Sequence, residues 1–161
     1  MEYQETEEDR LAEVFQRLDV HERRKISAKD IQLAFRTIGV SVTRARVDDI
    51  VWECDSDADG FLTLADIESM YYRAPQEASE FSPSRLLNLV EFLMYDPESS
   101  GFITVEDAMH IICRRFREQL SPALLRKFLL DTQLSPAKTL SFKEFVRQIR
   151  LRLKLAARSI T

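Results

Sequence analysis

One twelve-residue segment, residues 55–66, constrains the fold of this chain more than any other part of the sequence. Its first, third and fifth positions are the aspartates Asp55, Asp57 and Asp59, and its sixth is Gly60, which permits a sharp turn. Carboxylates at alternate positions followed by a glycine are the spacing of a calcium-binding loop between two helices. The segment therefore predicts a helix–loop–helix unit built around a hard divalent cation.

A second copy of this pattern follows at residues 96–107. Gly101 matches Gly60, and Ile103 matches Leu62 at the apolar eighth position. Since a repeat at a fixed period indicates a repeated structural unit, the two segments predict two similar helix–loop–helix units.

A third copy, at residues 19–30, keeps the acid at each end and Ile26 at the eighth position. Basic or bulky residues replace its ligands and its glycine, namely His21, Arg23 and Arg24. We expect this loop to keep its shape and to bind no metal.

The fourth copy is placed by its preceding helix. Apolar residues lie eight, five, four and one positions before each of the first two loops: Leu11, Val14, Phe15 and Leu18, then Val47, Ile50, Val51 and Cys54. A fourth loop starting at Gln133 gives the same offsets to Leu125, Phe128, Leu129 and Thr132 and ends at Glu144. A start at Asp131 would instead place Arg126 and Lys127 in the core. The helix before Asp96 departs from the pattern, because Asn88 and Glu91 occupy expected apolar positions.

Four such units predict an all-α chain of two lobes. The eighth-position residues Ile26, Leu62, Ile103 and Leu140 are separated by 36, 41 and 37 residues, and the longer middle interval indicates a linker. The predicted parts are an N-terminal pair (residues 1–72), a linker (73–84) and a C-terminal pair (85–161). We expect a short antiparallel contact between eighth positions within each pair, Ile26 with Leu62 and Ile103 with Leu140.

These motifs resemble the EF-hand superfamily, and the layout of four units in two lobes resembles calmodulin, troponin C, centrin and the myosin light chains. The resemblance covers roughly residues 8 to 152 and is most specific in the second loop. It implies that the lobes capture a helix of a partner protein, with or without a metal-driven change.

The resemblance also assigns metal ligands to loop positions 1, 3, 5, 7, 9 and 12. In the second loop these are Asp55, Asp57, Asp59, the carbonyl of Phe61, Thr63 and Asp66. Asp66 stands where the family usually has a longer Glu, which lowers the expected calcium affinity and brings the site nearer the six-coordinate preference of magnesium. In the third loop Asp96, Glu98, Ser100, the carbonyl of Phe102, Thr104 and Asp107 would form a weaker cage. The fourth loop offers Gln133, Ser135 and Ala137, and we expect it to bind no metal.

Other chemistry is not indicated. His21 and His110 are not spaced with other ligands or nucleophiles, so we expect no enzyme. Cys54 and Cys113 lack the spacing of a zinc site, and we expect reduced thiols, with a disulfide as the alternative. The absence of an apolar run of about 20 residues and the acidic N-terminus predict a soluble, cytoplasmic protein.

Charge divides the chain unevenly. Residues 1–80 carry 10 Lys and Arg against 19 Asp and Glu (−9), and residues 81–161 carry 13 against 8 (+5). The acidic half suits a basic amphipathic helix of a target protein. Aromatic residues of that half are expected in its groove or in the core: Phe15, Phe35, Trp52, Tyr71 and Tyr72.

The basic C-terminal segment, residues 146–161, has several interpretations. It is expected to be a solvated extension of the last helix, or to dock on an acidic partner, on a membrane surface or on the first lobe. No nucleic-acid binding is expected, because no recognition motif accompanies the basic residues.

Two hypotheses of function follow. In the first, the chain is a calcium-responsive regulator that binds a partner helix. In the second, it is a constitutive, light-chain-like subunit of a motor, cytoskeletal or flagellar assembly with little or no calcium response.

Overall fold

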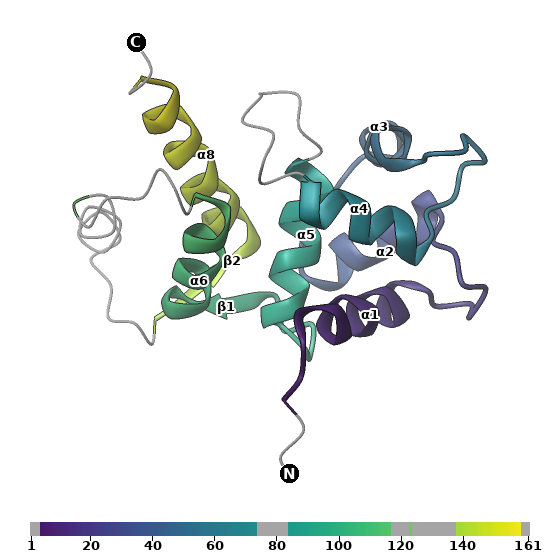
Figure 1. The fold of residues 1–161 in the computed structure, drawn as a ribbon, viewed down its shortest axis with the longest axis horizontal. Helices are drawn as coiled ribbons and strands as arrows, with labels where there is room; N and C mark the ends of the chain where they lie inside the picture. The colour runs from purple at the N-terminus through teal and green to yellow at the C-terminus, as the bar shows by residue number, and fades with distance from the viewer. Residues whose placement is uncertain (1–3, 74–83, 117–122, 124–137, 159–161) are drawn as a thin grey trace. The chain divides into compact units, whose positions relative to one another are not determined.

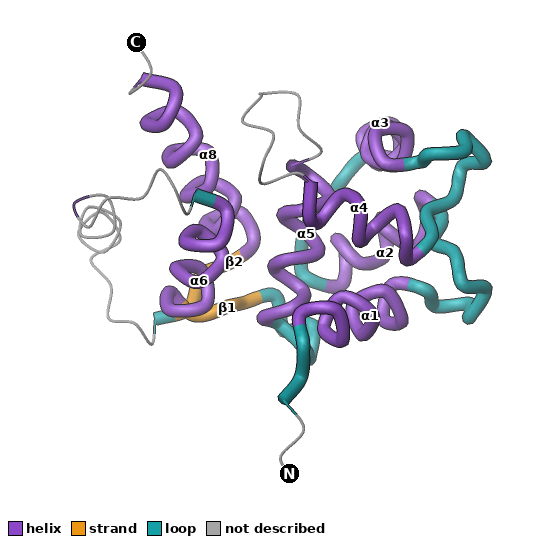
Figure 2. The backbone as a smooth tube through the Cα atoms, viewed as in Figure 1, coloured by secondary structure: helices purple, strands orange, loops and turns teal. Residues whose placement is uncertain are grey.

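A computed structural model of the chain describes residues 4–73, 84–116, 123 and 138–158. The described residues are mostly helical and include one two-stranded antiparallel sheet, which confirms the predicted all-α class (Figures 1 and 2). The elements are α1 (Glu7–Leu18), α2 (Ala28–Thr37), α3 (Arg44–Cys54), α4 (Leu64–Arg73), α5 (Ser84–Tyr95), β1 (Phe102–Thr104), α6 (Val105–Arg115), β2 (Thr139–Ser141) and α8 (Phe142–Arg158).

The apolar offsets predicted for the first two loops define the core of the first four helices. All eight residues are less than 9% exposed: Leu11, Val14, Phe15, Leu18, Val47, Ile50, Val51 and Cys54. They recur every three or four residues, so each helix presents one apolar stripe to its neighbours. The predicted helices are therefore held together mainly by burial of these stripes.

Hydroxyl side chains start several of these helices. Thr6 and Asp9 form a reciprocal capping box at α1, and Ser27 and Asp30 form one at α2. Such boxes satisfy amide groups that have no partner inside the helix. Helix starts are therefore fixed locally by the sequence.

The predicted contacts between eighth positions are both confirmed. The Ile26 amide donates to the Leu62 carbonyl at 2.8 Å and the Leu62 amide to the Ile26 carbonyl at 2.9 Å. In the sheet of β1 and β2, Ile103 lies opposite Leu140. The Ser141 amide donates to Glu144 at 2.9 Å, as the chosen register of the fourth loop requires. The helix predicted before that loop lies outside the described residues.

The chain forms two compact units, Met1–Ser99 and Ser100–Thr161. This division differs from the predicted lobes, because α5 joins the first unit although it was expected to begin the C-terminal pair. Residues 74–83 of the predicted linker lie outside the described part of the chain.

Helix α5 is anchored to α1 by two arginines. Arg17 donates from Nη1 to the Leu93 carbonyl at 2.7 Å and from Nη2 to the Asp96 carbonyl, also at 2.7 Å. The Arg10 guanidinium lies 4.5 Å from the centroid of the Tyr95 ring. Cations are favoured at a helix C-terminus, where carbonyls lack partners within the helix.

Most of the circumference of α5 is apolar and buried. Its buried residues are Leu86, Leu87, Leu89, Val90, Phe92 and Leu93, together with Asn88 and Glu91. A helix buried nearly all round need not carry a single apolar stripe. Asn88 and Glu91 are buried as the pattern expects of these positions although they are polar, and Asn88 Oδ1 accepts no hydrogen bond within the described residues.

Both cysteines are free thiols. Cys54 is buried, and this burial, with a smaller contribution from Glu53, raises its pKa to about 12. The thiol is therefore protonated at neutral pH and packs as a small apolar group. None of the helices in the described ranges is both long enough and apolar enough to cross a bilayer.

Candidate metal centre

The second loop joins α3 to α4 and folds back on its first residue. Asp55 caps α3, and its Oδ2 accepts a hydrogen bond from the Gly60 amide at 2.7 Å. The backbone has φ of 57° at Ala58 and 84° at Gly60. Glycine adopts the latter conformation without steric cost, so Gly60 makes the turn that the sequence pattern predicts.

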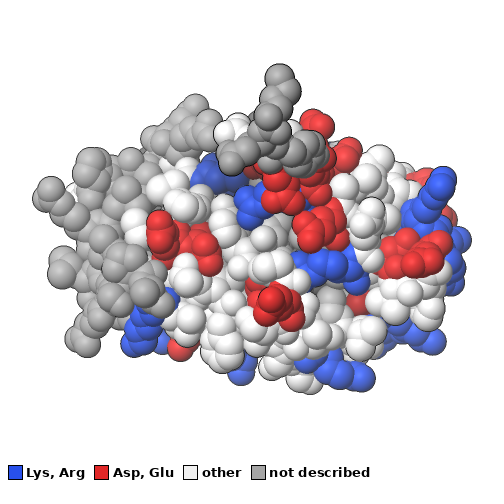
Figure 3. Space-filling model, turned by 90° about the horizontal axis from the view of Figure 1, so that it is seen from below, with Lys and Arg blue, Asp and Glu red and all other residues white. Residues whose placement is uncertain are grey.

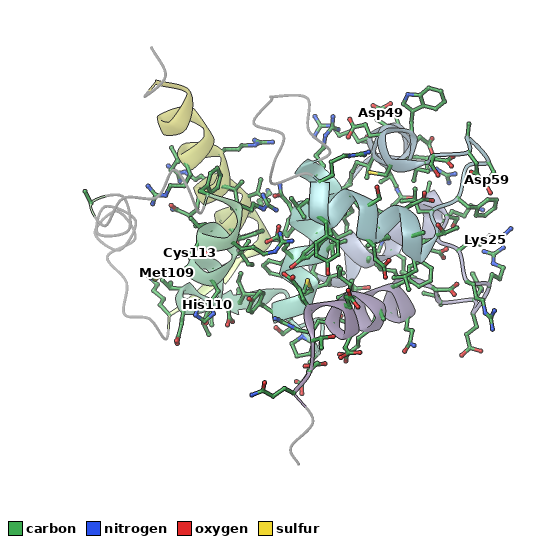
Figure 4. The ribbon with its side chains drawn as sticks, in the orientation of Figure 1. Lys25, Asp49, Asp59, Met109, His110 and Cys113 are labelled. Atoms are coloured by element: carbon green, nitrogen blue, oxygen red, sulfur yellow. The ribbon has the colours of Figure 1, made fainter. Side chains whose placement is uncertain are left out.

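The turn gathers three carboxylates. Asp55, Asp57 and Asp59 each place one oxygen within 4.8 Å of the others, and Figure 4 shows Asp59 in the loop beyond α3. No second group of three His, Cys, Asp or Glu residues comes this close anywhere in the described ranges. Because like charges at this distance repel, a cation between them would be stabilising.

The acid–base behaviour of two of these groups reflects their closeness. A hydrogen bond shared with Asp55 is the main cause that raises the pKa of Asp57. Burial acts to raise the pKa of Asp55, but hydrogen bonds from the Gly60 amide and from Asp57 outweigh it and lower the pKa overall. The loop therefore holds negative charge that a shared proton or a cation can neutralise.

One oxygen of the site has no partner. Asp55 Oδ1 is buried and accepts no hydrogen bond within the described structure. A buried acceptor left unpaired is costly, and a hard cation is the ligand that carboxylate oxygens prefer. The donor set therefore fits calcium or magnesium.

Asp66, the predicted twelfth-position ligand, is engaged elsewhere. Its Oδ1 accepts from the Ser56 hydroxyl at 2.7 Å and its Oδ2 from the Thr63 amide at 2.9 Å. The Asp66 amide donates in return to the Thr63 hydroxyl at 3.2 Å, which completes a capping box at the start of α4. Two of the predicted ligands, Thr63 and Asp66, thus also stabilise the start of α4.

Phe61 takes part in the loop through its backbone. Its amide donates to Asp59 Oδ1 at 2.9 Å, next to the carbonyl that is predicted as a ligand. The Asp59 amide donates in turn to Asp57 Oδ1 at 3.3 Å. These bonds tie the carboxylates of Asp57 and Asp59 to the backbone of the loop.

The predicted ligands of the third loop fall on both compact units. Asp96 is buried, whereas Glu98 and Ser100 are exposed. The Ser100 hydroxyl accepts from the Phe102 amide at 3.3 Å. Thr104 and Asp107 form a capping box at α6, with the Thr104 amide donating to Asp107 at 3.1 Å. Metal binding in this loop stays a prediction.

The capping role of the last loop acid has a sequence signal that the ligand pattern obscured. Each loop ends in Ser or Thr followed three residues later by Asp or Glu: Ser27 and Asp30, Thr63 and Asp66, Thr104 and Asp107, Ser141 and Glu144. This spacing is the signature of a capping box. In the fourth loop, Gln133, Ser135 and Ala137 lie outside the described residues.

Comparison with known proteins agrees with this geometry. Residues 8–72, which contain the first two loops, match the EF-hand domain pair. Calmodulin-like protein 2 of Arabidopsis thaliana is 22% identical over 87% of this chain and 90% of its own length. The probable calcium-binding protein CML25 of the same plant is 26% identical, over 87% of this chain and 73% of its own length. Troponin C isoform 2A of Homarus americanus is 23% identical, over 86% of this chain and 91% of its own length.

The fold, the loop geometry and the relatives agree with one another. Residues 8–72 match the EF-hand domain pair and contain the antiparallel contact between the first two loops. Over most of its length the chain is similar to calmodulin-like proteins and to troponin C.

Proposed function

We propose that this chain is a calcium-binding regulatory protein whose main metal site is the second loop. The observation that carries the proposal is the convergence of Asp55, Asp57 and Asp59 within 4.8 Å, with the buried Asp55 Oδ1 lacking a partner. Relatives named calmodulin-like and calcium-binding support it. The same relatives are not named as enzymes, and we propose a non-catalytic role.

The short Asp66 makes metal binding compete with helix capping. Each oxygen of its carboxylate already accepts one hydrogen bond, from the Ser56 hydroxyl and from the Thr63 amide, and a move of the carboxylate toward an ion would weaken these bonds. Because that capping box starts α4, occupancy of the loop is coupled to the start of this helix. Competition of this kind lowers calcium affinity and favours ions that accept fewer protein ligands, such as Mg²⁺.

A structural change caused by metal binding in the second loop would reach the first loop through the contact between Ile26 and Leu62. Both residues are fully buried and joined by two backbone hydrogen bonds. A shift of Leu62 therefore moves its partner loop, although the partner loop holds no metal. Two-state changes of EF-hand pairs on calcium binding act through such packed contacts.

The proposed partner is a basic amphipathic helix of a target protein. Residues 1–80 carry 19 acids against 10 basic residues, and Figure 3 shows several acidic groups on the face seen from below. Of the aromatic residues predicted for a groove, Phe15, Phe35 and Tyr71 belong to the core, whereas Tyr72 is 39% exposed and Trp52 is 75% exposed. The buried aromatics can contact a partner only if the helices move apart.

The C-terminal helix offers a second charged surface. Arg147 and Arg150 of α8 are exposed, and Phe145 and Ile149 on the same helix are buried. Such an amphipathic basic helix suits an acidic partner or an anionic membrane surface better than a nucleic acid without a recognition motif. We also propose a cytoplasmic location, with association to the cytoskeleton or a flagellum under the second hypothesis.

One observation favours the second hypothesis, a constitutive subunit of a motor, cytoskeletal or flagellar assembly. Asp19 closes the first loop by accepting hydrogen bonds from the amides of Arg23 and Arg24 at 3.0 and 2.7 Å. His21 and Arg23 stand at the third and fifth positions of this loop in place of carboxylates, so its shape rests on its own hydrogen bonds. In a constitutive subunit, binding to the partner would not need a metal ion.

Calorimetric titration of the full chain with CaCl₂ and MgCl₂ separates the two hypotheses. The regulator predicts one calcium site of micromolar affinity, with binding of an apolar dye or of a basic amphipathic helical peptide increased by calcium. The variant Asp57→Asn should give no heat of calcium binding. The variant Asp48→Asn, on α3 outside the loop, should give the same heat as the unchanged chain. Absence of calcium heat, with the peptide bound equally in EDTA, supports the constitutive subunit.

A further inference from the structure

A cleft of about 540 Å³ opens between the start of α2, the helix α3 and the second loop. Its apolar surface comes from Ala28, Val51 and Phe61, of which the first two are buried and the third half-buried. All three elements belong to the first compact unit. The cleft is thus a feature of one unit and of its fixed core.

An exposed tryptophan lines this cleft. Trp52 is 75% exposed, the most of the large apolar side chains in the described ranges, and it is the single tryptophan of the sequence. Isolated exposed apolar residues are common, but tryptophan beside a cleft is the side chain most enriched in binding hot spots. Burying its ring against a ligand would remove a large apolar area from water.

The charged residues around the cleft are unbalanced toward the positive. The lining has three cations, Arg23, Lys29 and Arg44, against two acids, Asp48 and Asp55, so its net charge is +1. The Arg44 Nε is paired with Asp48 Oδ1 at 2.9 Å. Asp57 and Asp59, which lie close to Asp55, are not part of the lining. The remaining cations of the lining, Arg23 and Lys29, are exposed and have no ion-pair partner in the part of the chain that the structure describes.

A further cation borders the same surface. The Lys25 Nζ lies 4.1 Å from the centroid of the Phe61 ring, and Figure 4 shows Lys25 on the loop beside that of Asp59. The basic cluster is unusual here, because residues 1–80 have a net charge of −9. A ligand that fits this cleft must therefore have the opposite charge to the basic helix proposed above.

We propose that this cleft binds an acidic peptide segment of a partner protein, with one apolar side chain against Trp52 and carboxylates beside Arg23 and Lys29. Charge complementarity selects the partner, and the aromatic wall supplies buried area. The cations of the cleft come from the first loop and from α2, and the metal loop also lines the cleft through Asp55, Ala58, Gly60 and Phe61.

The probe for a first test is a synthetic peptide, Glu-Asp-Glu-Leu-Phe-Glu-Asp-Glu, with blocked ends. It is titrated into the full chain in EDTA while the fluorescence of Trp52 is recorded. We expect a saturable blue shift, because the indole leaves water. The matched peptide with Gln and Asn in place of the acids should bind roughly tenfold more weakly or worse, since several charge pairs are lost.

Variants locate the site. The double variant Arg23→Gln with Lys29→Gln should weaken binding of the acidic peptide roughly 3- to 10-fold, and Arg46→Gln, an exposed arginine of α3 outside the cleft, should leave it unchanged. Trp52→Ala is followed by anisotropy of a fluorescein-labelled peptide and should also weaken binding. All are surface changes, and circular dichroism checks that they fold.

Specific outcomes would overturn the assignment. It fails if the acidic peptide produces no saturable change, or if Arg46→Gln weakens binding as much as the double variant, which would indicate a general charge effect. It also fails if sedimentation shows that the chain self-associates and that Trp52→Ala abolishes this association, because Trp52 would then be covered by a second copy of the chain.

Discussion

The first and second loops have nearly the same backbone but different chemistry. Each adopts positive φ at its fourth and sixth positions: 52° at Glu22 and 58° at Arg24 in the first loop, and 57° at Ala58 and 84° at Gly60 in the second. Left-handed conformations are costly for residues other than glycine. The first loop therefore keeps an EF-hand turn at the expense of local strain.

The first acid holds both turns closed. Asp19 Oδ2 accepts from the sixth-position amide of Arg24 at 2.7 Å, and Asp55 Oδ2 accepts from that of Gly60 at 2.7 Å. The loops differ at their third and fifth positions, where the second has carboxylates and the first has His21 and Arg23. The comparison indicates that shape depends on the first acid, the cap and the eighth position, whereas metal binding depends on the charges between them.

The largest expected effect tests whether the two loops contribute equally to the fold. Ile26→Ala and Leu62→Ala should each lower the free energy of unfolding by about 2–5 kcal/mol in EDTA, because each removes a fully buried side chain. Urea unfolding measures both. A much smaller loss for Ile26→Ala would show that the loop without ligands is only an appendage.

The tightest calcium binding should depend on the second loop. Asp59→Asn should lower the affinity about tenfold or more, since affinity follows ligand charge. The control Asp49→Asn changes an exposed acid of α3 and should have little effect. Equal losses in the two variants, measured by calorimetry, would contradict a defined site.

Variants of the capping residues should distinguish an effect on folding stability from an effect on calcium affinity. Ser27→Ala and Thr63→Ala each remove an N-cap hydroxyl and should cost about 1 kcal/mol of unfolding free energy in EDTA. Only Thr63→Ala should also weaken calcium binding. If Ser27→Ala lowers calcium affinity as much, the first loop takes part in metal binding.

The smallest effect concerns backbone strain in the first loop. Arg24→Gly should raise the free energy of unfolding by a few tenths of a kcal/mol. Glycine removes the steric strain of the positive φ in the folded state, and this gain exceeds the entropy that glycine adds to the unfolded chain. Arg23→Gly, at a neighbouring position without positive φ, should lower the free energy of unfolding. Thermal unfolding measures the stability of both variants. If Arg23→Gly stabilises the chain as Arg24→Gly does, strain at Arg24 is not the cause of the stabilisation.

Local patterns were sufficient for the helical class and for the pairing of loops. The offsets before the loops and the eighth-position residues depend on periodicity and on one turn, and the contacts of Ile26 with Leu62 and of Ile103 with Leu140 are confirmed. Periodicity identifies the face that each helix buries, so these features follow from neighbouring residues.

Long-range packing was not predictable in the same way. The placement of α5 in the first unit depends on hydrogen bonds from Arg10 and Arg17 to carbonyls 76 or more positions away. Surface arginines at these positions carry no local signal of that contact. Likewise, the ligand pattern did not indicate the capping bonds of Asp66, which accepts a hydrogen bond from the Thr63 amide, and its role as a metal ligand stays a prediction.

The most direct test of the account uses the three glycines of the chain, Gly39, Gly60 and Gly101. In a sample labelled only at glycine nitrogen, nuclear magnetic resonance gives one amide signal from each during a calcium titration. We predict that the Gly60 signal moves first and saturates, while that of Gly39, outside any loop, stays in place. A Gly60 signal that stays unchanged at saturating calcium would contradict metal binding in the second loop.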